Sequence, residues 1–244
     1  MTTERRIAVH GTYNLRDVGG YPAADGRVRA GRLLRSDGLH RLGPEGRTHL
    51  RDLGVGVVVD LRDEFEAQIM PDDLDGLDVT VVRLPLFEGS GASHGTEPVS
   101  LPALYTKIVT QHSGVVARAL REIATANTGV LVHCTAGKDR TGIVVALALL
   151  AVGVDRRLVV DDYARSEANL RGEWLDGMID LIVEHGGVES PELRVLMGGS
   201  PADALDAVLD ELETEHGSVR QYLLRSGLSL HDLELLNSVL VDRG

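Results

Sequence analysis

The only cysteine of this chain of 244 residues lies between an apolar run typical of a strand and another typical of a helix. Residues 130–150 read VLVHCTAGKDRTGIVVALALL, which places Cys134 and Arg140 in one short loop. A loop that enters a helix turns backbone N–H groups inward, with the positive end of the helix dipole behind them. The guanidinium of Arg140 can grip two phosphate oxygens, and the same field favours a thiolate at Cys134. The spacing therefore predicts a phosphate site with a nucleophilic sulfur.

The small residues of this loop suit the same chemistry. Ala136 and Gly137 let the backbone approach a phosphate without a bulky side chain in the way. A thiolate beneath a bound phosphate is placed for in-line attack on phosphorus, which gives a cysteinyl-phosphate intermediate. The alternative is a buried structural cysteine followed by a solvated helix start, because a cysteine outside a disulfide is usually buried and inert. The strand–loop–helix context favours the catalytic interpretation.

The stretch HCTAGKDRTG, residues 133–142, resembles the signature of Cys-based protein tyrosine phosphatases. Its GKDRT form is similar to that of an atypical bacterial branch that includes triple-specificity and lipid phosphatases. Further motifs resemble the same branch along nearly the whole chain: NLRDVGG at 14–20, RSD at 35–37, DLR at 60–62, DYARS at 162–166, and the C-terminal Gly217–Val219, Tyr222–Leu223 and Gly227–Leu228. The resemblance implies a phosphatase for phosphotyrosine, and leaves phosphoserine, phosphothreonine and phosphoinositides open as further substrates.

The resemblance also implies a role for each residue of the loop. Cys134 is the nucleophile, and Thr141 donates to the thiolate and helps it leave in the second step. His133 orients the loop or, with equal weight, is a satisfied core histidine. Phosphate binding falls to the guanidinium of Arg140 and to the backbone of Thr135, Ala136, Gly137, Lys138, Asp139 and Arg140. The product is inorganic phosphate, and no metal or organic cofactor is needed because the loop supplies the positive charge.

The departing oxygen needs a proton, and several carboxylates are candidates for the general acid. The Trp-Pro-Asp motif that supplies this acid in many tyrosine phosphatases is absent from the sequence. Asp139 is the first choice because it lies beside the phosphate, although an acid at a helix N-terminus also offsets the dipole. Asp60 and Asp63 follow a predicted parallel strand and are alternatives, and Glu88 is a weaker one.

Lys138 and Lys107 are the only lysines among 25 basic residues, so a lysine beside the cysteine is a specific feature. Lys138 is expected to add a second positive charge at the rim of the pocket. The resemblance implies that a lysine here accompanies activity on phosphoinositides. The competing interpretation is a solvated surface lysine.

Charged residues of the other motifs are candidates for supporting roles. Arg16 and Asp17 either support the phosphate loop from the N-terminal segment or form an ion pair that fixes a turn, and the sequence does not separate the two. Arg35 and Asp37 end a predicted strand and are candidates for the edge of the active site.

The composition excludes some function classes. The net charge of −12 argues against nucleic acid as a partner, because a phosphate backbone rewards basic patches. No HExxH pattern occurs and Cys134 has no second cysteine, so the chain shows no metal-ligand spacing. The chain has no apolar run of membrane-spanning length, its start lacks the apolar stretch of a secretory signal, and a single cysteine fits a reducing compartment. These features predict a cytoplasmic protein; unconventional export and the oligomeric state are left open.

Strands that alternate with helices predict an α/β fold: a mainly parallel four- to five-stranded central sheet flanked by helices, tyrosine-phosphatase-like, with a helical C-terminal half. The predicted strands are Arg32–Ser36, Val55–Leu61, Val79–Leu84 and Val130–His133. The predicted helices are Pro44–Leu53, Leu101–Gln111, Gly114–Ala126, Thr141–Val152, Arg156–Leu170, Glu173–His185, Pro201–Glu215, Val219–Leu224 and His231–Val241. No linker interrupts residues 1–244, so one phosphatase domain is expected, with the sheet core at about 28–152 and the helical part at about 155–244.

Two features of the helical part bear on its packing. Ser200 is expected to cap a helix that begins at Pro201, and Ser229 to cap the last helix. An apolar stripe through Trp174 and Met178 is either core or a lid over the pocket that faces substrate or lipid, with glycine pairs at 186 and 198 as hinges.

Two other classes of function compete with the phosphatase interpretation. A phosphate-binding module without turnover would capture a phosphorylated partner with the same loop, but binding alone does not require Cys134. A dinucleotide-binding protein would need a GxGxxG turn after a strand, and none of the predicted strands is followed by one.

Overall fold

The computed structural model describes residues 5–86 and 100–243 and contains a five-stranded sheet at its centre. The strand order is β1–β4–β7–β5–β6, and every pair is parallel except β1 with β4. These strands are β1 (Arg16–Asp17), β4 (Leu33–Ser36), β5 (Val55–Asp60), β6 (Thr80–Arg83) and β7 (Gly129–His133). The predicted mainly parallel sheet is confirmed, and β1 is an additional edge strand.

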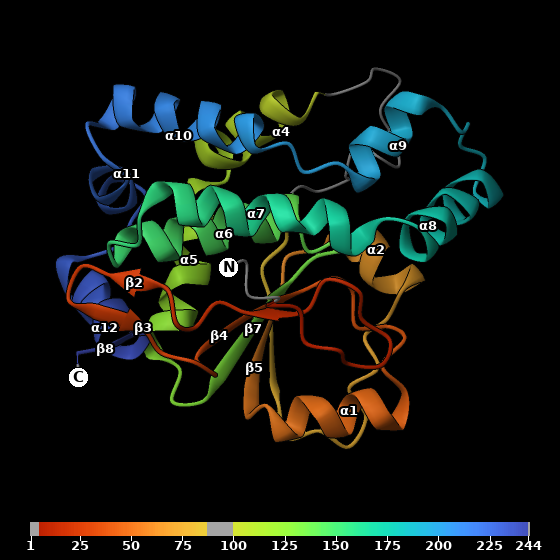
Figure 1. The fold of residues 1–244 in the computed structure, drawn as a ribbon, viewed down its shortest axis with the longest axis horizontal. Coiled ribbons are helices and arrows are strands. Elements are labelled where there is room, and N and C mark those ends of the chain that lie inside the picture. Colours follow the sequence, from red (N-terminus) through yellow and green to blue (C-terminus); the bar gives the residue numbers. More distant parts are fainter. Residues whose placement is uncertain (1–4, 87–99, 244) are drawn as a thin grey trace.

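The central strands are apolar throughout because helices cover both faces of the sheet. Side chains alternate between the faces. Val59 and Val132 enter the larger hydrophobic core, whereas Val58 and Leu131 enter a second core together with Leu50 of helix α1 (Gly43–Asp52). Figure 1 shows α1 below the sheet and helices α6 (Asp139–Ala151) and α7 (Arg156–Leu170) above it.

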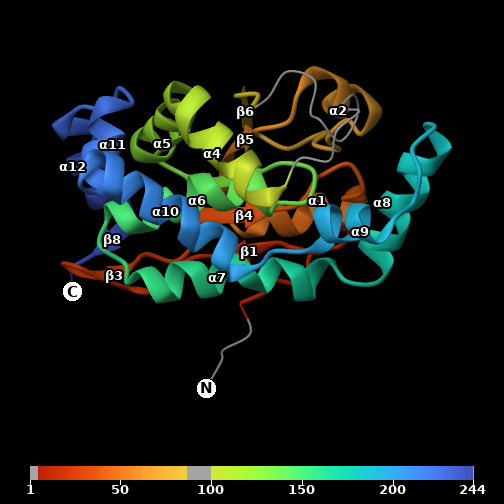
Figure 2. The same cartoon turned by 90° about the horizontal axis from the view of Figure 1, so that it is seen from above.

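Helix α6 is the central helix of the larger core. Its first ten residues after Asp139 are buried, so it is apolar all round rather than amphipathic. The remaining helices are α2 (Glu64–Ile69), α4 (Leu101–Gln111), α5 (Ser113–Thr125), α8 (Glu173–Glu184), α9 (Pro191–Gly198), α10 (Ala202–His216), α11 (Val219–Arg225) and α12 (Leu230–Leu240). Helices α8 and α9 lie at the end of the molecule opposite α11 and α12 (Figure 2). Among the described residues, no helix is both long enough and apolar enough to cross a membrane.

A second, three-stranded sheet corrects the expectation that strands end before residue 155. It pairs β2 (Pro22–Ala23) with β3 (Gly26–Val28) and β3 with β8 (Val241–Asp242). Val241 was expected to continue the last helix, but it pairs with Val28 instead. A strand of two residues carries no periodicity, so its partner far away in the sequence decides its conformation.

The starts of the helices show where a local sequence signal is enough to predict the N-cap. Ser229 caps α12 with a reciprocal capping box, as predicted. The predicted cap at Ser200 is wrong: α10 begins at Ala202, and the Ser200 hydroxyl accepts from the Glu167 N–H and donates to the Ala164 carbonyl. Ser200 therefore binds the C-terminal half of α7 rather than its own helix. Helices α2 and α9 were not predicted because six and eight residues are too few for a clear apolar period.

Candidate active site

Cys134 follows the central strand β7 at the carboxyl edge of the sheet, where ligands of parallel sheets bind. Strands β4 and β5 end at the same edge, because their last residues Ser36 and Asp60 are both in register with His133. The cysteine is 2 % exposed and is not in a disulfide. The loop from Cys134 to Lys138 then enters α6 at Asp139.

The carbonyl groups of this loop are held by the surrounding protein. The Thr135 carbonyl accepts from the Gly38 N–H at 3.0 Å. The Asn14 Nδ2 donates to the Ala136 carbonyl at 2.9 Å and to the Gly137 carbonyl at 3.2 Å, and Arg35 Nη2 donates to the Gly137 carbonyl at 2.8 Å. These hydrogen bonds fix the orientation of each peptide plane, and therefore also the direction of the N–H groups between them.

The backbone N–H groups of the loop, those of residues 135–138, are without acceptors in the described part of the chain. The first N–H groups of α6 follow directly, and a helix N-terminus has no internal partner for them. Gly137 makes this turn possible: its φ is +65°, and a Cβ here would clash with the Ser36 carbonyl.

A buried ion cluster lies behind the loop. Asp162 pairs with Arg35 at 2.8 Å and with Arg16 at 3.6 Å, and all three side chains are 1 % exposed. Burial alone would raise the pKa of Asp162, but the positive charges of Arg16 and Arg35 outweigh burial and lower the pKa below its ordinary value. The carboxylate is therefore ionised. Burial and the charge of Arg35 lower the pKa of Arg16 to about 10. Two guanidinium groups against one carboxylate leave a net positive charge beneath the loop.

Arg140 is held by a carboxylate that no motif indicates. Its Nη1 and Nη2 bind the two oxygens of Glu66 at 2.5 and 2.6 Å, and the Thr135 hydroxyl donates to the same carboxylate at 2.6 Å. Burial would raise the pKa of Glu66, but Arg140 and Thr135 lower it to about 2. Burial would likewise lower the pKa of Arg140, but the pair with Glu66 raises it. The guanidinium is thus charged and fixed in its plane.

Asp139 and Lys138 are joined to two tyrosines from other helices. The Tyr105 hydroxyl donates to Asp139 Oδ1 at 2.6 Å, and the hydroxyls of Tyr105 and Tyr163 are in hydrogen-bond contact. Burial and the charge of Asp139 raise the pKa of Tyr105 well above its usual value, so Tyr105 remains a donor. Lys138 Nζ lies 2.8 Å from Asp139 Oδ2, with its side chain 1 % exposed. Lys138 was expected at the pocket rim or in solvent; instead it is buried and its charge is compensated by Asp139.

The sequence that forms this site is similar to that of known proteins along most of the chain. A sequence model described as "Tyrosine phosphatase family" matches residues 7–242. The chain belongs to the tyrosine phosphatase family. It is 32 % identical to the triple specificity protein phosphatase PtpB of Mycobacterium tuberculosis over 95 % of this chain and 97 % of that protein. It is also 34 % identical to a putative tyrosine-protein phosphatase of Cupriavidus necator over 86 % of this chain and 80 % of the relative.

A third relative in the same class is the tyrosine-protein phosphatase of Nostoc commune. It is 32 % identical over 86 % of this chain and 74 % of the relative. The resemblance drawn from the sequence motifs is confirmed by these matches, and this chain is a phosphatase with an α/β fold.

Two residues at the ends of the loop, His133 before Cys134 and Thr141 after Arg140, are fully buried. His133 is 0 % exposed, and its Nδ1 lies 3.3 Å from the Cys134 carbonyl. Thr141 is also 0 % exposed, and its hydroxyl has no partner among the described residues. The donation from Thr141 to the thiolate stays a prediction.

The other carboxylates that the sequence offered as site residues have structural partners: an arginine, a helix start or a turn. Asp60 is bound by Arg62 through both carboxylate oxygens, and Asp63 caps α2, so both carboxylates have structural partners; a role of either as the acid stays a prediction. Asp17 accepts from the N–H groups of Gly19 and Gly31 at 2.7 Å each, which fixes a turn. Glu88 lies outside the described residues.

The sequence left two roles open for Arg16: an ion pair with Asp17 or support of the phosphate loop. The structure does not show the ion pair. Arg16 pairs with Asp162 rather than with Asp17, and it donates to the Ser166 hydroxyl and to Asn14 Oδ1. Through Asn14 it supports the phosphate loop. Asp37 is buried and accepts from the N–H groups of residues 13 and 14, so it orients this segment; burial raises its pKa to about 6.

The apolar stripe of α8 packs beside the loop. Trp174 and Met178 are buried with Ala136 and Leu170 in a separate small core. This contact supports the core interpretation of the stripe and places α8 against a residue of the phosphate loop. The movement of this helix as a lid stays a prediction.

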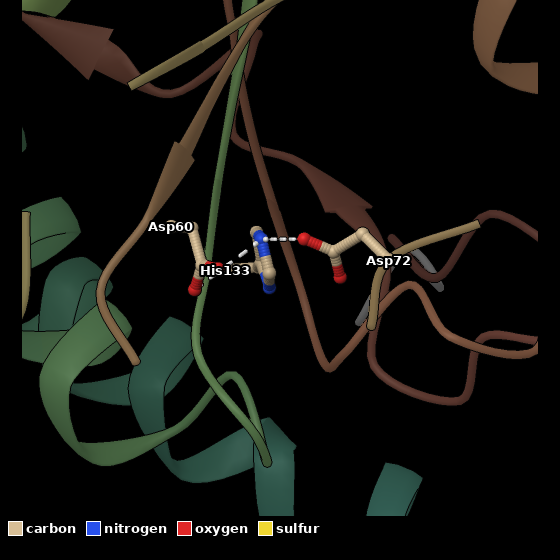
Figure 3. Close-up of side chains that lie close together, drawn as sticks. All are labelled: Asp60, Asp72 and His133. Atoms are coloured by element: carbon tan, nitrogen blue, oxygen red, sulfur yellow. Dashed lines mark ion pairs between the residues drawn. The ribbon is translucent and has the colours of Figure 1, made fainter. Parts of the chain in front are cut away.

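Three residues at the site were missed by the sequence analysis: Glu66, Tyr105 and Asp72, whose carboxylate lies 2.8 Å from Arg62 Nη2 and 3.3 Å from His133 Nε2 (Figure 3). For Glu66 the only local signal is its place three residues after Asp63, where it completes a capping box. Asp72 and Tyr105 reach the site from a loop and a helix that are distant in sequence, and no spacing rule connects them to the cysteine.

The pair with Arg140 predicts a pH-dependent contribution of Glu66 to stability. The folded pKa of about 2 lies below the ordinary glutamate value of 4.5, so the stabilisation is present above pH 4.5 and is lost as the pH falls toward 2. Glu66→Gln should lower the free energy of unfolding by about 3 kcal/mol at pH 7 and by less than half of that at pH 3. Urea unfolding at several pH values measures this difference.

The exposed Glu64 on the same helix provides the control. Glu64→Gln should change the free energy of unfolding by less than about 0.5 kcal/mol at both pH values. A Glu66→Gln effect that stays constant from pH 7 to pH 3 would contradict the ionised pair.

Proposed function

We propose that this phosphatase hydrolyses phosphoric monoesters with Cys134 as nucleophile and without a cofactor. Its principal substrate is phosphotyrosine of proteins, and phosphoserine and phosphothreonine are further substrates. The observation that carries the proposal is the loop after β7: its carbonyls are bound by the protein, and the N–H groups of residues 135–138 are left for an anion. A cytoplasmic location, which keeps a single thiol reduced, belongs to the same proposal.

The first step forms a covalent intermediate. The Cys134 thiolate attacks phosphorus in line with the leaving oxygen, so the S–P bond forms while the P–O bond breaks. Arg140 has five N–H donors, of which Glu66 takes two and the Leu61 carbonyl accepts a third at 3.5 Å, so the remaining donors are available for phosphate oxygens. Negative charge that develops on these oxygens is stabilised by donors that are already oriented.

Asp139 gives its proton to the leaving oxygen. The Tyr105 hydroxyl, which donates to Oδ1, keeps this carboxyl in place, and Lys138 Nζ lies 2.8 Å from both of its oxygens. A phosphate dianion in the loop would compete with Asp139 for Lys138. In the second step water attacks phosphorus, Asp139 takes up a proton from this water, and the S–P bond breaks to release inorganic phosphate.

The buried cations explain how an acidic protein binds a dianion. The chain carries a net charge of −12, which repels phosphorylated substrates at long range. Arg140 inside the loop and the excess positive charge of Arg16 and Arg35 beneath it act at short range, where little water screens them. The site is therefore selective for a compact anion that can enter the loop.

Phosphoinositides are the second substrate class, and Lys138 is the observation that favours them. An inositol ring carries neighbouring phosphates, so one phosphate can occupy the loop while another binds the ammonium that Asp139 holds in the free protein. The relatives' names refer to protein substrates and to triple specificity, and both substrate classes are compatible with those names.

Replacement of the nucleophile tests the proposal. Cys134→Ser should lower kcat for p-nitrophenyl phosphate at least about a thousandfold, because a serine hydroxyl is not ionised at neutral pH. Binding of a phosphotyrosine peptide, measured by calorimetry, should persist because the loop and Arg140 are unchanged. Full hydrolysis by the variant would contradict the mechanism, and no hydrolysis by the wild type would favour a binding module.

Asp139→Asn tests the general acid. The rate on phosphoserine and phosphothreonine peptides should fall about a hundredfold, whereas p-nitrophenyl phosphate, whose leaving group needs no proton, should be affected less. The alkaline limb of the pH–rate profile should disappear, since it reports ionisation of the acid. An unchanged rate and profile would remove Asp139 from this role; Asp161→Asn, an exposed position on α7, is the control.

Lys138→Ala separates the two substrate classes. We expect a loss of activity on phosphoinositides at least about tenfold larger than the loss on a phosphotyrosine peptide, because only the inositol offers a second phosphate. Initial rates of phosphate release on both substrates give the ratio. Equal losses would remove the support for lipid specificity, and Lys107→Ala, at an exposed site on α4, is the matched control.

A further inference from the structure

The side chain of Asn14 connects helix α7 to the phosphate loop. It is 0 % exposed and precedes β1, the strand that lies beside α7 (Figure 2). Its Nδ2 donates to the carbonyls of Ala136 and Gly137, at 2.9 and 3.2 Å. Its Oδ1 accepts from Arg16 Nη1 and, at 3.0 Å, from Asn169 Nδ2. Two hydrogen bonds on each side are the full capacity of an amide, so every polar atom of this buried side chain has its partners.

The partners on the two sides require opposite ends of the Asn14 amide. A guanidinium can only donate, so the atom of Asn14 that faces Arg16 is the oxygen. A carbonyl can only accept, so the atom that faces Ala136 and Gly137 is the nitrogen. A half-turn of the amide would place its oxygen against two carbonyls and its nitrogen against a guanidinium. The observed orientation is therefore favoured on both sides at once.

Asn169 reaches this amide from the C-terminal end of α7, 155 residues away in the sequence. The Nη1 of Arg16, which is the other donor to Oδ1, also donates to the backbone carbonyl of Asn14. Asn169 therefore supplies a separate donor, which fills the second lone pair of Oδ1. In a buried site an acceptor without its donor costs free energy, so removal of the Asn169 amide would weaken the hold on the Asn14 orientation.

The same turn of α7 also contacts the loop through an apolar side chain. Leu170, the next residue in the sequence, is buried together with Ala136 and Trp174 in one small core. The end of α7 thus meets the loop twice: through Leu170 at a side chain, and through Asn169 and Asn14 at the carbonyls. Both contacts lie on the side of the loop that is turned away from the free N–H groups, so they act on the shape of the loop.

We infer that Asn169 is a positioning residue of the phosphate loop, because it fixes the amide of Asn14. This amide in turn holds the carbonyls of Ala136 and Gly137, so that the N–H groups of the loop are already directed at the anion. Binding then spends less free energy on ordering the loop. The inference rests on the proposed function, because it takes the loop after β7 as the phosphate site.

Binding of inorganic phosphate, measured by calorimetry, tests this inference without turnover. Asn169→Ala should raise the Kd of phosphate about threefold, and Asn14→Ala about tenfold, as expected for loss of one and of several hydrogen bonds. Ser200→Ala is the control. It removes a buried hydroxyl that binds α7 at Glu167 and Ala164, and it should leave the Kd of phosphate unchanged.

The double variant separates a positioning role from a general loss of stability. If Asn169 acts through Asn14, the double variant should bind phosphate no more weakly than Asn14→Ala alone. Independent, additive effects in the double variant would overturn the inference, and so would an unchanged Kd in a folded Asn169→Ala variant. Asn169 is half-buried at the end of a helix, so its single variant decides the question if Asn14→Ala does not fold.

The inference and the proposed function fail in different ways. Hydrolysis that survives Cys134→Ser removes the proposed function, whereas binding of phosphate to the loop is measured without the chemical step. Equal phosphate affinity of the wild type and Asn169→Ala removes the inference alone. A wild-type protein that binds no phosphate would overturn both.

Discussion

The site depends on the fixed orientation of the peptide planes after Cys134. The carbonyls of residues 135–137 are bound by Gly38, Asn14 and Arg35, so the N–H groups between them are directed to the opposite side. A loop of this length would otherwise lose its shape to conformational freedom, and an anion would have to order it at a cost in affinity. The donors come from the N-terminal segment and from the end of β4. The parallel sheet and β1 therefore matter for function because they bring these donors to the end of β7.

Buried carboxylates organise the cations of the site. Glu66 fixes the plane of Arg140, Asp162 holds Arg16 and Arg35, and Asp60 and Asp72 hold Arg62 with His133. Each carboxylate limits the cost of burying a guanidinium, and the hydrogen bonds fix the direction of that guanidinium. Removal of one partner would leave an uncompensated charge in the core, so under the proposed mechanism these residues couple stability to catalysis. The arrangement gives a local positive site in a protein whose net charge is −12.

The residues of the site that lie close together in the sequence could be predicted from it. The residues that reach the site from distant parts of the chain could not. Cys134, Gly137 and Arg140 lie within one strand–loop–helix unit, where spacing alone predicts an anion site. Glu66 and Tyr105 enter from helices elsewhere in the chain, and without a fold their distance to the loop has no sequence signal. Lys138 illustrates the limit within the loop itself: its position was evident, but its burial and its pairing with Asp139 depend on how the surrounding helices pack. The same holds for β8, whose two residues adopt a strand only because β3 lies beside them.

The most direct test of the account is the identification of the covalent intermediate. The wild-type protein is mixed with p-nitrophenyl phosphate, denatured within the first turnover, and analysed as the intact chain and as peptides by mass spectrometry. The account predicts a mass increase of one phosphoryl group, located on the sulfur of Cys134 and absent when this thiol is alkylated beforehand. A phosphoryl group on another residue, or hydrolysis that continues after Cys134 is alkylated, would contradict it.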